Sequence, residues 1–132
     1  MHLVEDRVLS PGQADALALG FELLVSPTRL RMLHALACAD ELCVRDLYLL
    51  LDLEQSTVSH QLRMLRDRGI VRRRKRGRLA WYRLDDPALR AFLSGFDGRA
   101  GASGVPEDGV SPWALAVPHP LPDAPQRPSS SV

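Results

Sequence analysis

The sequence has no long hydrophobic run: no stretch approaches the roughly 20 apolar residues that a membrane-spanning helix needs. The first residues, MHLVEDR, are acidic and lack the apolar stretch of a secretory signal peptide. Cysteine is scarce, because Cys38 and Cys43 are the only two, which favours thiols or metal ligands over a disulfide framework. Together these absences predict a cytoplasmic protein.

Enzyme motifs are also absent. The sequence shows no carboxylate pair, nucleophile triad, glycine-rich phosphate loop or closed metal-binding motif. Its 132 residues suffice for one domain and not comfortably for two. We therefore predict a protein that is not an enzyme and is built around one domain.

Net charge is only +1, so the total does not indicate a nucleic-acid partner, but the distribution of charge does. Ten of the 17 lysine and arginine residues lie between Arg63 and Arg83, against one acid, Asp67. Residues 1–62 carry nine acids and four arginines. This asymmetry predicts a field that steers a polyanion to one end of the molecule.

Composition divides the chain into three parts. Residues 1–10 are expected to be a flexible arm, and residues 11–97 carry the helical and strand signals of a folded domain. Residues 98–132 hold seven of the ten prolines and end in SSSV, so we expect a disordered tail.

Start and stop signals place the elements of the domain. Ser26-Pro27 and Asp86-Pro87 each combine an N-cap side chain with proline at the first helical position. Gly69 offers a left-handed residue at a helix end, and Gly77 a turn between two strands. The expected elements are helices at about 13–25, from 27 to a break at 39–41, at 44–52, at 55–68 and from 87, with strands in IVRRRKRG and RLAWYRL.

The segment STVSHQLRML, residues 56–65, carries the functional signal. Val58, Leu62 and Leu65 fall at helical spacing, and small hydrogen-bonding side chains lie between them. In helix-turn-helix proteins the N-terminal half of such a helix touches base edges in the major groove, while neighbouring cations hold phosphates. The alternative is a solvated helix face beside a solubilising run of charge. The expected DNA-binding residues are Ser56, Thr57, Ser59, His60, Gln61, Arg63, Arg66, Arg74, Arg76 and Arg78.

The predicted fold class is therefore mainly α with a β-hairpin wing (α+β), a winged helix-turn-helix in the order α-α-α-α-β-β-α. The first and last helices present apolar faces that a small domain would gain by pairing with a second copy. A two-fold homodimer would read a palindromic site with half-sites about 34–36 Å apart. The expected dimer-interface residues are Leu17, Phe21, Leu24, Leu89, Phe92, Leu93 and Phe96.

Four stretches, SPTRLRMLHAL, ELCVRDL, QSTVSHQLRMLRDRGIV and GRLAWYRL, resemble the ArsR/SmtB family of metal-responsive repressors. In that family the positions matching Ser56, Ser59 and His60 contact DNA, and the hairpin forms the wing. The resemblance implies a cytoplasmic homodimer that binds double-stranded DNA through a palindromic operator and releases it when an inducer binds.

The resemblance also implies a metal site at Cys43. Family members that sense metals from this helix use the matching cysteine, either with a second cysteine two positions on or with an acid three positions on. Arg45 replaces the second cysteine here, which weakens a site for arsenite, whereas Asp46 matches the acid. The partner's arm would add His2, Glu5 or Asp6, giving a mixed set of donors for Zn(II), Co(II) or Ni(II). With Cys38 as a second thiol, the site would suit Cd(II), Pb(II) or Zn(II), and Zn(II) and Cd(II) are the inducers expected first.

Other interpretations of the cysteines stay open. Cys38 lies five residues before Cys43, so the two thiols could share a metal or form a disulfide or persulfide bridge. A buried cysteine is also often only a small core residue. The family's other metal site, on the last helix, is not expected, because Ala88 replaces its histidine. The remaining alternatives are a DNA-binding protein that senses thiol oxidation or has no inducer, and a protein-interaction module that does not bind DNA.

Overall fold

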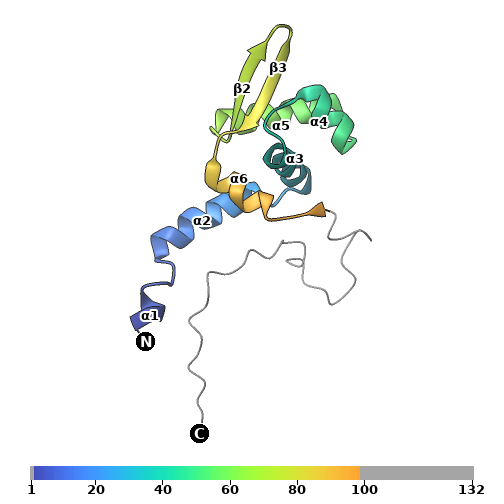
Figure 1. Cartoon of the computed structure of the whole chain (residues 1–132). Helices are drawn as coiled ribbons and strands as arrows, with labels where there is room; N and C mark the ends of the chain where they lie inside the picture. The colour runs from blue at the N-terminus through green and yellow to red at the C-terminus, as the bar shows by residue number, and fades with distance from the viewer. Residues whose placement is uncertain (1, 99–132) are drawn as a thin grey trace. The chain divides into compact units, whose positions relative to one another are not determined.

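The computed structural model describes residues 2–98 of the chain, and their side chains from residue 4 onwards. Its elements follow the order α1, α2, α3, β1, α4, α5, β2, β3, α6 (Figure 1). The chain divides into two units, residues 1–86 and 87–132, so α6 is described separately. The predicted fold class is confirmed. Two short elements are additional to the predicted order: α1 (His2–Glu5), inside the expected arm, and β1 (Leu42–Cys43).

The first two long helices begin at serine N-caps. Helix α2 (Pro11–Leu23) starts and ends two residues earlier than expected. Ser10 explains the early start: its Oγ accepts from the Gln13 N–H at 3.2 Å, and the Gln13 side chain accepts from the Ser10 N–H at 2.9 Å. Helix α3 (Pro27–Cys38) starts as predicted, with Ser26 Oγ accepting from the Arg29 N–H at 3.3 Å.

Helices α4 (Val44–Leu51) and α5 (Gln55–Asp67) form the helix-turn-helix. The chain leaves α4 through Asp52, which has a φ of 53° and is left-handed. Aspartate tolerates this conformation better than most side chains. The N–H of Leu53 then donates to the Tyr48 carbonyl at 3.0 Å, which closes the end of α4 and sets the direction of α5.

The hairpin joins β1 to make a three-stranded antiparallel sheet in the order β1-β3-β2, with β2 spanning Val71–Arg76 and β3 Leu79–Leu84. Gly69 after α5 and Gly77 in the hairpin turn have φ angles of 74° and 61°, so the predicted role of both glycines is confirmed. At the other end of the hairpin, the Asp85 N–H donates to the Ile70 carbonyl at 2.9 Å.

The core of the first unit is formed by side chains of α3, α4, α5 and the base of the hairpin. Helix α3 contacts α4 and β3, α4 contacts α5, and α5 contacts β2. These contacts hold α5 rigidly against the hairpin. The buried side chains of these elements are Met32, Leu33, Leu36, Ala37, Leu47, Leu51, Val58, Leu62, Leu65, Val71 and Leu84, and Leu23 of α2 and Cys43 of β1 are buried as well.

Helix α6 (Pro87–Ser94) begins at the predicted proline but is only eight residues long. Leu93 is buried, whereas Phe92 is exposed. Phe96 lies beyond the end of the helix, and its ring packs edge-on against that of Phe92 with centroids 5.4 Å apart. None of the helices in residues 2–98 combines the length and apolar character needed to cross a bilayer.

Candidate nucleic-acid interface

Helix α5 divides cleanly into a buried and an outward face. Val58, Leu62 and Leu65 are completely buried, so the helix is fixed in rotation as well as in position. Ser56, His60 and Arg63 are exposed, and Thr57, Ser59 and Gln61 are half-buried. The outward face of the first two turns is therefore built from short hydroxyls, an imidazole and an amide. Side chains of this kind can donate to or accept from base edges and phosphates.

Gln61 differs from its neighbours because it already has a partner. Its Oε1 accepts from the Arg29 Nε at 3.3 Å, and the same guanidinium donates to the Leu23 carbonyl at 3.1 Å. Arg29 therefore ties the end of α2, the start of α3 and the middle of α5 together. This role of Arg29 could not be predicted, since nothing in its local sequence shows a partner 32 residues away.

The arginines of the hairpin are extensively paired with acids. Arg72 Nε lies 2.8 Å from Asp85 Oδ2. Arg74 and Arg76 both reach Glu41, with nitrogen–oxygen distances of 3.3 and 2.6 Å. The Arg76 guanidinium carbon also lies 5.0 Å from the centroid of the Trp81 ring. Two of the predicted phosphate contacts, Arg74 and Arg76, are thus held by groups of the protein itself.

The remaining predicted phosphate contacts are exposed. Arg63 and Arg66 project from α5, and Arg78 lies in the hairpin turn. Within residues 2–98 none of these three forms an ion pair. They are available to an incoming polyanion without displacing an internal acid.

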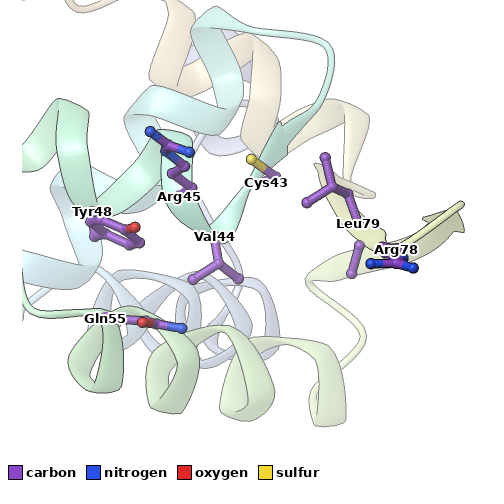
Figure 2. A pocket seen from close by; sticks show the side chains of 8 residues that line it. Cys43, Val44, Arg45, Tyr48, Gln55, Arg78 and Leu79 are labelled. Carbon is purple, nitrogen blue, oxygen red and sulfur yellow. The ribbon is translucent and has the colours of Figure 1, made fainter.

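A small hollow lies where α4, α5 and the hairpin meet (Figure 2). Its volume is about 190 Å³. Gln55, the first residue of α5, lines one side, and Arg78 and Leu79 come from the hairpin. Cys43 lines it from the start of α4, so this cysteine shares the hollow with residues of both α5 and the hairpin. The other lining residues are Val44, Arg45, Tyr48 and Ala80.

Cys43 and Asp46 come together at the N-terminus of α4. Cys43 is the N-cap residue and is only 6% exposed. Its backbone N–H donates to Asp46 Oδ2 at 3.2 Å. The carboxylate therefore already caps its own helix, and it lies beside the cysteine that the sequence analysis paired with it.

Cys38 is the last residue of α3, and its thiol lies close to the ring of a histidine. The Cys38 Sγ lies 3.8 Å from Nε2 and 3.9 Å from Nδ1 of His34, one helical turn earlier. Both cysteines are free thiols, Cys38 exposed and Cys43 buried. The side chain of His2 lies outside the described residues. Within the described part of one chain, no three side chains of histidine, cysteine, aspartate or glutamate cluster to hold a metal ion.

Of the two helices expected to form the dimer interface, α2 is highly exposed and α6 is short. In α2 every residue except Leu23 is exposed, including Leu17 at 48% and Phe21 at 42%. Leu24 caps the C-terminus of that helix and is half-buried. In α6, Phe92 is 41% exposed.

Comparison with known proteins shows that the chain is similar to bacterial transcriptional regulators. A family model described as "Bacterial regulatory protein, arsR family" matches residues 26–73. The chain is 45% identical over 83 residues to a transcriptional repressor SmtB homolog of Synechocystis sp., covering 63% of this chain and 62% of that protein. It is 33% identical over 112 residues to the arsenic resistance transcriptional regulator ArsR1 of Pseudomonas putida, covering 85% of this chain and 82% of that one.

Solved structures agree with the sequence comparisons. The AntR antimony-specific transcriptional repressor superposes with a TM-score of 0.59 and 37% identity, over 66% of this chain and 78% of the other. The match spans about three fifths of the length of some curated relatives, 62% of the Synechocystis protein and 60% of a CadC homolog of Staphylococcus aureus.

Proposed function

The chain belongs to the ArsR/SmtB family of bacterial regulatory proteins, and from this we propose that it is a homodimeric transcriptional repressor that leaves its operator when an inducer binds. The family consists of regulators and not enzymes, as the sequence analysis predicted. The relatives are named for SmtB, for cadmium resistance and for arsenic resistance. Those names support an inducer that is a metal or metalloid ion.

The observation that carries DNA binding is the division of α5 into two faces. Val58, Leu62 and Leu65 are fully buried, which fixes the opposite face outward. Ser56, Ser59 and His60 on this face would read base edges from the N-terminal half of the helix. Arg63 and Arg66, which have no acid partner within residues 2–98, would hold the flanking phosphates.

The exposure of α2 supports dimerisation. A helix of 13 residues with almost every side chain exposed buries too little of its own surface to be stabilised by the chain alone. A second copy that covers Leu17 and Phe21 would supply the missing burial. We expect the dimer to place two copies of α5 one helical turn of DNA apart, on a palindromic operator.

The inducer site is proposed at the start of α4. Cys43 and Asp46 supply a thiolate and a carboxylate, fewer donors than the four of a typical zinc site. A partner chain's N-terminal arm, with His2, Glu5 or Asp6, would complete the set. Zn(II) and Cd(II) suit such mixed sulfur, nitrogen and oxygen donors. A bound ion would join the Cys43 thiolate and the Asp46 carboxylate to the partner's arm through coordinate bonds.

A second inducer class is supported by one observation. Cys38 is exposed and lies 3.8 Å from an imidazole nitrogen of His34, so this thiol is accessible to small oxidants or persulfides. Under this alternative the same DNA-binding surface would respond to thiol modification and not to a metal.

The deciding experiment selects DNA from a pool of random duplexes with the reduced protein. We expect an inverted repeat to be recovered, with 1–3 kcal/mol of specificity per base pair as a rough scale. His60→Ala should relax the preference at the matching positions, whereas Arg7→Ala, which removes an exposed charge next to α1, should leave the selected sequence unchanged. Failure of the protein to bind any duplex at low salt, together with a stable complex with another protein, would favour an interaction module.

A further inference from the structure

The hairpin wing, formed by β2 and β3, has two faces. In the part of the chain that the structure describes, the cationic side chains of one face are paired with acids, and those of the other are not. Successive side chains of a strand point to opposite faces. In β2, Arg72, Arg74 and Arg76 therefore share one face, and Arg73 and Lys75 share the other with Val71. Val71 is buried opposite Leu84, so this second face is buried at the base of the hairpin.

All three arginines of the first face have an acid partner. Asp85 holds Arg72, and Glu41 holds both Arg74 and Arg76. Arg76 is held a second time by the face of Trp81. Glu41 comes from the segment just before β1, and its side chain is only 20% exposed. One carboxylate thus partners two of the wing's cations.

The second face has no such partners. Among residues 2–98 neither Arg73 nor Lys75 forms an ion pair, and both are exposed. They lie further along the same face as Val71, and β2 contacts α5. Their charges continue the unpaired charge of Arg78 in the turn.

We propose that Glu41 limits the DNA affinity of this protein by withholding Arg74 and Arg76 from phosphates, so that Arg73, Lys75 and Arg78 make the wing's phosphate contacts. This inference rests on the proposed DNA binding. It replaces two of the phosphate contacts expected from the sequence with Arg73 and Lys75. A duplex that recruits Arg74 or Arg76 competes with a carboxylate that already attracts both guanidinium groups, whereas Arg73 and Lys75 lose only water.

The test measures how affinity for a fluorescein-labelled mixed-sequence duplex falls between about 50 and 200 mM salt, for the full chain and its variants. Each phosphate contact contributes about 0.9 to the log–log slope. Glu41→Gln should tighten binding and steepen the slope by about 0.9 to 1.8, as one or both freed arginines reach phosphates. Arg74 should carry more of this gain, because Arg76 keeps Trp81 as a partner.

The matched control is Asp40→Asn, which changes the net charge equally at an exposed residue next to Glu41 that pairs with no wing arginine. Arg73→Ala should reduce the slope more than Arg74→Ala in the wild-type background, and the two losses should become similar in the Glu41→Gln background. Circular dichroism and thermal melting check that each variant is folded.

Two results would overturn the inference. One is a Glu41→Gln protein whose salt dependence equals that of Asp40→Asn. The other is an equal loss from Arg73→Ala and Arg74→Ala in both backgrounds. If the wild-type chain binds no duplex even at low salt, the proposed function fails as well, which separates that outcome from a failure of the Glu41 inference alone.

Discussion

Cys43 on β1 lies directly opposite Trp81 on β3, and Trp81 in turn lies opposite Arg74 on β2. Cys43, the candidate inducer-binding residue, and Arg74 of the wing are therefore separated only by Trp81 across the three-stranded sheet. The same cysteine is the N-cap of α4, the first helix of the helix-turn-helix. A ligand that moves Cys43 has a direct mechanical connection to both DNA-facing elements, through strand pairing on one side and the start of a helix on the other.

We expect Cys43→Ser to bind DNA normally and to lose its response to the inducer. The substitution removes the thiolate but keeps a small side chain at the N-cap, where serine is favoured. The measurement is release of the selected duplex during titration with Zn(II), Cd(II) or arsenite. Typical couplings of about 1–3 kcal/mol correspond to roughly 5–150-fold changes in affinity. Cys38→Ser is the comparison, and release lost in this variant but retained in Cys43→Ser would move the sensor to α3.

We expect Phe21→Asp to produce a monomer that binds DNA weakly. Phe21 is 42% exposed on α2, and a charge there opposes burial against a second copy. Sedimentation equilibrium gives the mass, and duplex titration gives the affinity. Leu49→Asp, on an exposed leucine of α4, is the matched control and should stay dimeric. A wild-type chain that sediments as a monomer at every concentration would refute the dimer.

We expect Ser26→Ala to lower the free energy of unfolding by about 1 kcal/mol, within the usual range of about 0.5–2 kcal/mol for a lost N-cap. The Ser26 side chain accepts from the Arg29 N–H, and Arg29 also holds Gln61 on α5. Urea denaturation followed by circular dichroism measures the change. Ser10→Ala removes the equivalent cap of α2, where nearly every residue is exposed, and should cost less in the same assay.

We expect Leu62→Ala to cost about 2–5 kcal/mol of stability, because Leu62 is completely buried and the truncation leaves a cavity. The neighbouring change Arg63→Ala, on the exposed face of the same helix, should leave stability almost unchanged and weaken DNA binding. Thermal melting and duplex titration of both variants measure the two effects. The opposite pattern, with the loss of stability at residue 63, would mean that α5 is rotated and that its outward face is not the one described.

Local signals were enough to predict the elements that position the site. Ser26-Pro27 starts α3 through a hydroxyl cap and a proline, both of which act within one turn. The spacing of Val58, Leu62 and Leu65 predicted the buried face of α5, since helical periodicity maps directly onto burial. Gly69 and Gly77 occupy the left-handed positions that the turn chemistry requires.

Features that depend on distant partners could not be predicted. Strand β1 is only two residues long, too short to show any alternation. Glu41 meets Arg74 and Arg76 across 33 and 35 residues, and only the register of β1 with β3 brings them together. The left-handed turn at Asp52 could not be predicted, because no glycine marks that position. The expected tail, residues 98–132, lies outside the described residues apart from Gly98.

The intrinsic fluorescence of Trp81 can report on the wing. Its ring is half-buried, lies beneath the Arg76 guanidinium and is next to the strand that carries Cys43. The chain has only one other tryptophan, Trp113. Replacing Trp113 with phenylalanine would leave a single fluorophore whose emission follows the wing, so occupancy of the cysteine and engagement of a duplex could be watched in the same cuvette without attaching a dye.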